Sequence, residues 1–291
     1  MQQQAGAAPS MPLPLGVARF SLAGRKALVT GGTRGIGRAI VEQLGAAGAA
    51  VYVCARRADD VARAVDELRA QGIDAQGSAC DVSDRAQCAA LVKSVEEAFG
   101  GELHLLVNNA GTNIPAPTLS YGEAEYRGVL AANQESAYVL CQLCHPLLAA
   151  AARGGAGGGG AVPGGGGVPG GSCIAFISSV AGGPLAGRSG SLYAMTKAAL
   201  NQLAKNLACE WAKDGIRVNS VAPWVTLTEL GKQNLADPVM SERLVARTPL
   251  GRLADPQDIA GVVSFIASPA AAYVTGQTIA VDGGYSVMGF W

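Results

Sequence analysis

A glycine-rich turn between a short apolar run and an amphipathic helix constrains this chain more than any other feature. Ala-Leu-Val at 27–29 forms the run, Gly31, Gly35 and Gly37 interrupt it, and apolar residues then return at helical spacing. A strand that turns directly into a helix leaves backbone N–H groups unpaired at the positive end of the helix dipole. Glycines there let a pyrophosphate approach the backbone. The stretch predicts a dinucleotide site, with a turn that binds nothing as the alternative.

Strand-like and helical segments alternate along the rest of the chain. Apolar runs typical of buried strands occupy residues 50–54, 103–108, 173–178, 216–221 and 278–281, residues 75–80 form a weak further strand, and helical patterns lie between them. Such alternation predicts parallel βαβ units and a sheet covered by helices on both faces. A chain of 291 residues that is 49% hydrophobic can bury a full core, so we expect one α/β domain.

Composition narrows the classes of partner. Lys plus Arg number 22 and Asp plus Glu 22, so the formal net charge is zero and no basic footprint for nucleic acid is present. No apolar run reaches the roughly 18 residues of a membrane span. The seven cysteines have apolar neighbours, which indicates buried free thiols in a reducing compartment. We expect a cytoplasmic protein that binds neither nucleic acid nor membrane.

Two segments fall outside the alternating pattern. Residues 1–18 carry no charge and are rich in Gln, Ala and Pro, which predicts a disordered tail ahead of a domain at 19–291. The tail lacks the pattern of a secretory signal, and organelle targeting stays open as an alternative. Residues 153–171 supply 12 of the 40 glycines, which predicts a surface insertion in the domain.

The end of the second apolar run bears on cofactor choice. A protein that binds NAD places Asp or Glu there, about 20 residues beyond the glycines. Here Arg56 and Arg57 follow the run, the first acid is Asp59, and Arg34 sits inside the glycine turn. Guanidinium groups bind phosphate bidentately, so Arg34 and Arg56 favour the 2′-phosphate of NADP(H). The alternative is that these arginines are merely solvated.

Tyr193 and Lys197 lie four residues apart near the start of a helix, so their side chains share one face. An ammonium beside a phenol is expected to lower the phenol pKa from about 10 and to allow proton exchange near neutrality. Upstream, Ser178 and Ser179 end a predicted strand, at the edge where open α/β sheets hold ligands. The order Ser, then Tyr-x-x-x-Lys, predicts acid–base chemistry on a bound substrate.

These motifs together resemble the short-chain dehydrogenases/reductases. The resemblance runs from about Ala18 to the C-terminus and rests on Thr30–Gly37, Asn108–Gly111, Asn133, Ser179 and Tyr193-x-x-x-Lys197. More narrowly, four segments resemble the tropinone reductase-like branch: 18–22, 135–142, 207–214 and 221–225.

The resemblance implies a Rossmann-type doubly wound parallel sheet of seven strands in a single domain, assembled as a homodimer or homotetramer. It implies Tyr193 as general acid/base, Lys197 as the residue that lowers its pKa and holds the nicotinamide ribose, Ser179 as the group that polarises the carbonyl, and Asn133 as the holder of a relay water. The cofactor-binding residues expected from the motifs and the arginine argument are Gly31, Thr33, Arg34, Gly35, Ile36, Gly37, Arg56, Asp81, Val82, Asn109, Tyr193, Lys197 and Thr226.

The chain departs from the family pattern at three points. Ser179 and Tyr193 are 14 positions apart where the family has 13, so the choice of Ser179 over Ser178 is less secure. Trp224 replaces a glycine after Pro223, as in the tropinone reductase-like branch, and Pro115 stands where tropinone reductases carry a polar or aromatic substrate contact. The last difference argues against tropinone as the substrate, and residues 226–247 are expected to form a substrate lid.

The sequence therefore predicts an NADPH-dependent carbonyl reductase that transfers a hydride to a small, cyclic ketone, with no metal. Two alternatives stay open. One is an NAD(P)-dependent alcohol dehydrogenase of the same fold. The other is a non-catalytic cofactor-binding scaffold, which the retention of all four catalytic positions disfavours.

Overall fold

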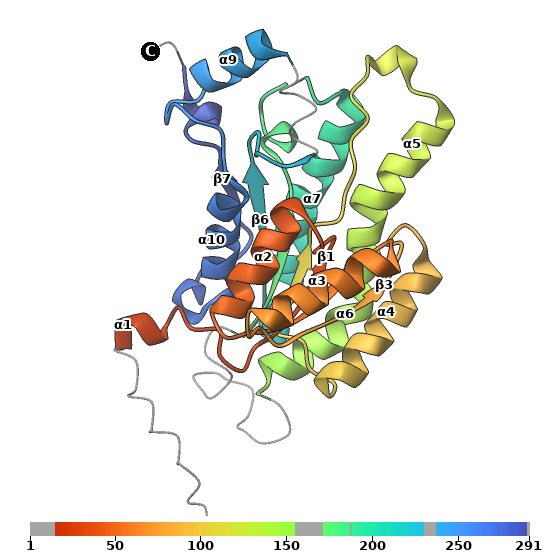
Figure 1. The fold of residues 1–291 in the computed structure, drawn as a ribbon, viewed down its shortest axis with the longest axis vertical. Coiled ribbons are helices and arrows are strands. Elements are labelled where there is room, and N and C mark those ends of the chain that lie inside the picture. Colours follow the sequence, from red (N-terminus) through yellow and green to blue (C-terminus); the bar gives the residue numbers. More distant parts are fainter. Residues whose placement is uncertain (1–14, 155–170, 187, 230–236, 290–291) are drawn as a thin grey trace, which may run out of the picture.

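The computed structural model describes residues 15–154, 171–186, 188–229 and 237–289. One parallel sheet forms the centre of the molecule, with helices on both of its faces (Figure 1). The strands are β1 Lys26–Thr30, β2 Ala50–Ala55, β3 Ala75–Ala79, β4 Leu105–Asn108, β5 Ser172–Ile177, β6 Ile216–Pro223 and β7 Thr278–Val281. The α-helices are α1 Leu15–Ala18, α2 Gly35–Ala46, α3 Ala58–Ala70, α4 Arg85–Phe99, α5 Glu123–Leu130, α6 Ser136–Ala152, α7 Ser191–Glu210, α9 Pro238–Ala246 and α10 Pro256–Ala267.

The seven strands lie in the order β3-β2-β1-β4-β5-β6-β7, and every pairing is parallel. The chain runs outward from β1 to β3 and then crosses back to β4 on the other side of β1. A ligand site is expected at this reversal, beyond the carboxyl ends of the strands. The α/β doubly wound sheet predicted from the sequence is confirmed.

Alternate residues of each inner strand enter two separate hydrophobic cores. In β1, Leu28 packs toward α4, α6 and α7, whereas Ala27 and Val29 pack toward α2, α3 and α10. In β2, Tyr52 and Val53 divide in the same way. Successive side chains of a strand point to opposite faces, so a strand that is apolar at every position requires helices on both sides.

The long helical stretch expected near 123–152 is interrupted. Between α5 and α6, residues Ala131–Glu135 form a π-helical turn, and Asn133 is buried within it. A π turn inserts one residue into the helix and is common at functional sites. The periodicity of the sequence did not reveal this irregularity, because the apolar positions on both sides still follow helical spacing.

Three expectations concern segments that are only partly described. In the predicted tail, residues 15–18 form α1 and residues 1–14 lie outside the described part. In the predicted insertion, Arg153, Gly154 and Gly171 are described and 155–170 are not. In the predicted lid, α9 lies at the end of the molecule toward which β6 points (Figure 1), and 230–236 are not described.

One expectation about the cysteines is wrong. Six of the seven thiols are buried, but Cys209 is exposed, because it lies on the outer face of α7. Cys141 and Cys144 both face the interior from α6, and burial raises the pKa of each thiol. Over the described ranges, no helix is both long and apolar enough to cross a membrane.

Candidate active site

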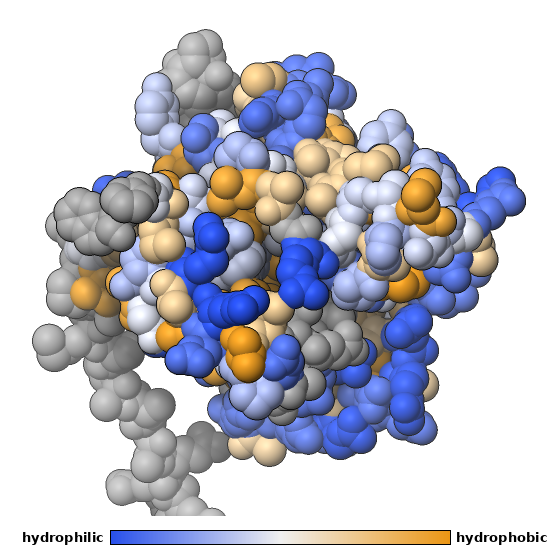
Figure 2. Space-filling view, turned by 90° about the horizontal axis from the view of Figure 1, so that it is seen from above, coloured by the Kyte–Doolittle hydropathy of each residue, from blue (hydrophilic) through white to orange (hydrophobic). Residues whose placement is uncertain are grey.

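A cavity of about 2020 Å³ lies beyond the carboxyl ends of the strands. It is larger than the ~300–1,000 Å³ of a pocket for one drug-sized ligand. Every cofactor-binding residue expected from the sequence lines this cavity, as do Ser179, Tyr193 and Lys197. Viewed toward this end of the molecule, the surface mixes hydrophilic and hydrophobic residues (Figure 2).

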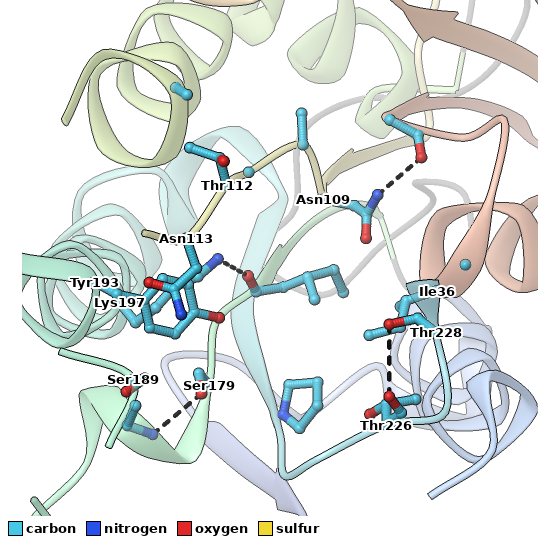
Figure 3. A pocket seen from close by; sticks show the side chains of 18 of the residues that line it. Ile36, Asn109, Thr112, Asn113, Ser179, Ser189, Tyr193, Lys197, Thr226 and Thr228 are labelled. Atoms are coloured by element: carbon cyan, nitrogen blue, oxygen red, sulfur yellow. Dashed lines mark hydrogen bonds between the residues drawn. The ribbon is translucent and has the colours of Figure 1, made fainter. Parts of the chain in front are cut away.

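The glycine turn is held closely against the end of β4. Asn109 donates from Nδ2 to the carbonyl oxygens of Thr30 (2.8 Å) and Gly31 (3.1 Å) (Figure 3). Thr30 Oγ1 accepts from the backbone N–H groups of Asn109 and Ala110. A Cβ on Gly37 would collide with the Gly31 carbonyl and with Asn109 Nδ2, so only glycine allows this packing. Asn109 therefore fixes the shape of the turn, and Thr30 is a supporting residue that sequence reasoning missed.

Two arginines at this end of the cavity have no acidic partner among the described residues. Arg34 and Arg56 line the cavity and are exposed, and neither forms an ion pair there. Arg57, by contrast, lies 3.4 Å from Asp60, whose carboxylate also accepts from Arg63 at 2.6 Å. Asp60, the acid after β2 that lines the cavity, is thus already paired, and two guanidinium groups stay available for an anion.

Tyr193 and Lys197 lie on the first turns of α7 and share one face, as their spacing predicts (Figure 3). Lys197 is only 5% exposed, and its Nζ donates to the carbonyl oxygen of Ile177 at 2.8 Å. The same nitrogen lies 5.4 Å from the centre of the Tyr193 ring. The ammonium therefore faces the aromatic ring and the end of β5.

The pKa of Tyr193 shifts in the direction opposite to expectation. Although the ring borders the cavity, loss of solvation raises the pKa of the phenol, and only contact with Ser179 acts in the other direction. Lys197 does not contribute to the shift: its ammonium lies over the ring, 5.4 Å from the ring centre, and one of its N–H groups donates to the Ile177 carbonyl. Burial lowers the pKa of Lys197 itself to about 8. The phenol thus keeps its proton at neutral pH, beside a lysine that is close to titration.

The structure separates the two serines that the sequence could not. Ser178 is buried, and its hydroxyl donates to the backbone carbonyl of Lys197 at 3.0 Å. Ser179 lines the cavity, and its hydroxyl oxygen accepts from the N–H of Ala181 at 3.1 Å, which leaves its own proton free to donate (Figure 3). A Cβ on Gly182 would collide with the backbone of Lys197 and Ala198, so this turn packs tightly against α7.

Asn133 lies behind the cavity wall and does not line it. Its Oδ1 accepts from the Thr112 N–H at 2.8 Å, and its Nδ2 donates to the Thr112 carbonyl at 2.9 Å and to Thr196 Oγ1 at 3.1 Å. Thr196 in turn donates to the carbonyl of Tyr193. The side chain of Asn133 thereby ties the loop after β4 to the helix that carries Tyr193, and Thr112 and Thr196 are partners that the sequence did not indicate.

The remaining predicted residues lie at the rim of the cavity. Asp81 and Val82 follow β3, and the Asp81 carboxylate accepts from both the N–H and the hydroxyl of Ser83. Thr226 follows β6 and donates to the carbonyl of Trp224. Trp224 itself stacks on Tyr285, with ring centroids 3.5 Å apart and planes 10° apart. Tyr285, far away in the sequence, was not among the expected residues.

Comparisons with known proteins agree with this geometry. Residues 25–159 match the family model described as short chain dehydrogenase, and residues 164–286 match one described as enoyl-(acyl carrier protein) reductase. A tropinone reductase homolog of Arabidopsis thaliana is 46% identical over 272 residues, which is 94% of this chain and 96% of that protein. The chain belongs to the short-chain dehydrogenases/reductases, in their tropinone reductase-like branch.

Two further relatives bear on function. A chloroplastic tropinone reductase homolog of Arabidopsis thaliana is 44% identical over 94% of this chain and 79% of its own length. The crystal structure of a gluconate 5-dehydrogenase from Burkholderia cenocepacia, in complex with NADP and tartrate, superposes with a TM-score of 0.83 at 32% identity and covers 94% of this chain and 100% of that one. This short-chain dehydrogenase/reductase is accordingly an NAD(P)(H)-dependent oxidoreductase that acts on alcohol or ketone groups of small molecules.

Proposed function

We propose that this protein is an NADPH-dependent carbonyl reductase that reduces a small ketone, with Tyr193 as the general acid. The observation that carries the proposal is the placement of Ser179, Tyr193 and Lys197 together in the cavity (Figure 3). The same cavity is lined by Arg34 and Arg56, which have no acidic partner among the described residues. An alcohol dehydrogenase working in the opposite direction uses the same groups, and kinetics with both cofactors separates the two directions.

The cofactor end fits a phosphorylated dinucleotide. The turn after β1 lines the cavity beside the N-terminus of α2, where backbone donors and the helix dipole favour an anion such as a pyrophosphate. Arg34 and Arg56 supply two cations for a 2′-phosphate, whereas Asp60, the acid that could accept from ribose hydroxyls, is paired with Arg57 and Arg63. NADP bound to a relative of known structure agrees with this choice.

The residues divide the chemistry of reduction between them. Bound NADPH supplies the hydride for the carbonyl carbon. The Ser179 hydroxyl donates a hydrogen bond to the carbonyl oxygen, and the Tyr193 phenol gives its proton to the same oxygen, so that C=O becomes CH–OH. Lys197 keeps a positive charge beside the phenolate that remains, and Asn133 holds the loop that faces it.

The Tyr193→Phe variant tests the proposal. The ring is retained and only the exchangeable proton is lost, so we expect ketone reduction to fall by at least about a hundredfold. NADPH binding, followed by the fluorescence of the bound nicotinamide, should persist.

The control is Tyr273→Phe, which removes the same hydroxyl from a fully exposed ring remote from the cavity. It should reduce ketones at the wild-type rate. Turnover by Tyr193→Phe within tenfold of the wild type would remove Tyr193 from the acid role, and a wild type that binds NADPH but reduces no ketone would favour the scaffold alternative.

The proposal also covers the oligomeric state of the enzyme and its location in the cell. We expect a homodimer or homotetramer in the cytoplasm, with organelle import through the N-terminal residues as the alternative because one relative is described as chloroplastic. Light scattering of the purified protein measures the assembly. Fluorescent fusions with and without residues 1–18 measure the location, and import that requires these residues would overturn the cytoplasmic assignment.

A further inference from the structure

Three buried polar atoms of residues that line the cavity have no hydrogen-bond partner in the described part of the chain. Across the described residues, seven buried side-chain atoms are unpaired in this way. Asn113 Oδ1, Ser189 Oγ and Trp224 Nε1 belong to residues that line the cavity, whereas the residues of the other four do not. Buried polar groups are almost always paired, so an unpaired set gathered at one cavity calls for an explanation.

These residues come from three different segments that line the same cavity as the proposed acid. Asn113 lies in the loop after β4, Ser189 in the loop between β5 and α7, and Trp224 directly after β6. Figure 3 shows Asn113 and Ser189 on the part of the cavity that also carries Ser179 and Tyr193. A molecule whose carbonyl meets Tyr193 therefore has its neighbouring atoms beside Asn113 and Ser189, and Trp224 lines the same cavity.

The loops that carry Asn113 and Ser189 are joined to each other. Tyr121 donates from its hydroxyl to the carbonyl of Ile114 at 2.8 Å and accepts from the N–H of Ala116. Thr118 Oγ1 and Ser191 Oγ form a hydrogen bond of 2.9 Å between the two segments. The two segments that carry Asn113 and Ser189 are thus connected by hydrogen bonds, which restrict the movement of one segment relative to the other.

Trp224 is also held in one orientation. Its indole stacks on Tyr285, and its backbone N–H donates to the carbonyl of Val281 at 3.2 Å. The Asp282 carboxylate accepts from the N–H groups of Gly284 and Ser286, which fixes the turn that presents Tyr285. A rigid indole with a buried, unpaired N–H is a directional donor for an oxygen atom.

The hydrogen-bonding roles of the three atoms indicate which ligand group can pair with all of them. An amide oxygen requires a donor, an indole N–H requires an acceptor, and a serine hydroxyl can take either role. Hydroxyl groups satisfy all three and also suit either orientation of the Asn113 amide. A tertiary ammonium of the kind found in tropinone has nothing to accept from Trp224, and a carboxylate has nothing to donate to the Asn113 oxygen.

We propose that the substrate is a hydroxylated ketone whose hydroxyl groups bind Asn113, Ser189 and Trp224 beside Tyr193. The proposal rests on the carbonyl reductase activity proposed above and names its substrate class. An apolar ketone leaves the same three atoms buried without partners, and a site built for hydroxyl groups discriminates against an analogue that lacks them.

Matched ketones test the proposal, because each pair exchanges a hydroxyl for a methyl group of similar size. Hydroxyacetone is compared with butanone, and dihydroxyacetone with diethyl ketone, in NADPH oxidation assays. We expect kcat/KM to favour the hydroxylated member by about tenfold to a hundredfold. Equal or better reduction of butanone and diethyl ketone would overturn the assignment.

Variants of single residues test whether Ser189 and Trp224 cause the preference for hydroxylated ketones. Ser189→Ala removes one hydroxyl, and Trp224→Phe retains a ring to stack on Tyr285 but lacks the N–H. Each should move the ratio of kcat/KM for the two members of a pair toward one. The control is Ser94→Ala on α4, whose hydroxyl donates to the Ala90 carbonyl outside the cavity, and it should retain the wild-type ratio. A ratio that changes equally in Ser189→Ala and Ser94→Ala would also overturn the assignment.

Binding without turnover separates this proposal from the proposed reductase activity. The Tyr193→Phe variant saturated with NADPH is titrated with each ketone, and quenching of the nicotinamide fluorescence reports binding. Tighter binding of the hydroxylated ketones with no reduction by the wild type would support the polar subsite and reject the reductase activity. Equal binding within both pairs would reject the subsite, whatever the activity.

Discussion

Lys197 shows how far the charge of one side chain depends on its surroundings. Its ammonium is buried, reaches the Ile177 carbonyl and the face of the Tyr193 ring, and has a pKa lowered to about 8 by loss of solvation. The lysine is therefore mostly protonated at neutral pH and loses its proton above pH 8. The Tyr193 phenol, whose pKa burial raises, keeps its proton over the same range.

This arrangement predicts the pH dependence of ketone reduction. As pH rises through about 8, the positive charge beside the phenolate is lost, so kcat/KM measured with saturating NADPH should fall. The dissociation constant of NADPH at pH 7 and at pH 9 serves as the control, since it separates loss of cofactor from loss of chemistry. A profile that stays flat up to pH 10 would mean that Lys197 titrates like an ordinary exposed lysine.

Arg56 offers a second test on a single residue. Replacing it by Asp should weaken NADPH through repulsion of the 2′-phosphate and improve NADH by providing an acceptor for a ribose hydroxyl. We expect the ratio of kcat/KM for NADPH over NADH to fall by about tenfold or more. Arg153→Asp makes the same charge change at the end of α6, outside the cavity, and should leave the ratio near its wild-type value. An unchanged ratio in Arg56→Asp would place Arg56 in solvent.

At the scale of single residues, the sequence predicted which side chains share a helical face, but not which groups surround them in the folded chain. Four-residue spacing placed Tyr193 and Lys197 on one helical face, because helix geometry is local. The direction of the Tyr193 pKa shift and the choice of Ser179 over Ser178 depend on which backbone carbonyl each side chain meets in the folded chain. The unpaired atoms of Asn113, Ser189 and Trp224 also depend on neighbours far away in sequence.

Among the elements, the glycine turn and the π turn differ in how visible they are to sequence reasoning. Glycine spacing between an apolar run and a helix identified the turn after β1, because close approach of backbone leaves no other residue type. The π turn at Ala131–Glu135 has no such residue signature. It is stabilised by Asn133, whose three hydrogen bonds reach the loop after β4 and α7.

Gly37→Ala tests the packing of the glycine turn. The added methyl group collides with the Gly31 carbonyl and with Asn109 Nδ2, so the turn must open or α2 must shift. We expect NADPH affinity to fall by at least about tenfold and the protein to lose about 1–3 kcal/mol of stability, as for other overpacked sites. Titration of nicotinamide fluorescence and thermal unfolding measure the two effects.

The matched control for this variant is Gly261→Ala on α10. There a Cβ meets nothing within 4 Å, and alanine favours the helix. This protein should bind NADPH as the wild type does and should be no less stable. Wild-type affinity in Gly37→Ala would show that the turn tolerates a side chain and that its glycine is not required for cofactor binding.

Over the whole molecule, α/β architecture followed directly from the alternation of apolar and helical segments. The alternation of strand-like and helical segments did not predict where the loops between the helices and strands lie. The loops around the cavity are joined by side-chain hydrogen bonds such as Thr118 to Ser191, and such pairs are long-range. The described ends of the glycine-rich segment, Gly154 and Gly171, lie between the end of α6 and the start of β5.

That placement predicts the effect of removing the segment. Because β5 begins next to Gly171 and ends next to Ser178, the segment joins the sheet at the edge opposite the cavity. Replacing residues 155–170 by a short Asn-Gly linker should leave kcat/KM within about twofold and should not lower the melting temperature, since loop length changes stability only slowly. A folded deletion variant that has lost most of its activity would show that the segment acts on the site.

The parallel sheet has a consequence for how such proteins diverge. All seven strands point the same way, so each loop lies either at the carboxyl ends of the strands, where the cavity is, or at their amino ends. Insertions and substitutions in the loops at the amino ends of the strands alter neither cofactor nor substrate contacts, so selection for activity does not oppose them. Changes at the carboxyl edge alter specificity directly. Two lineages can therefore differ widely in length and composition at one edge while they retain the same reaction, and can change substrate through a few residues at the other.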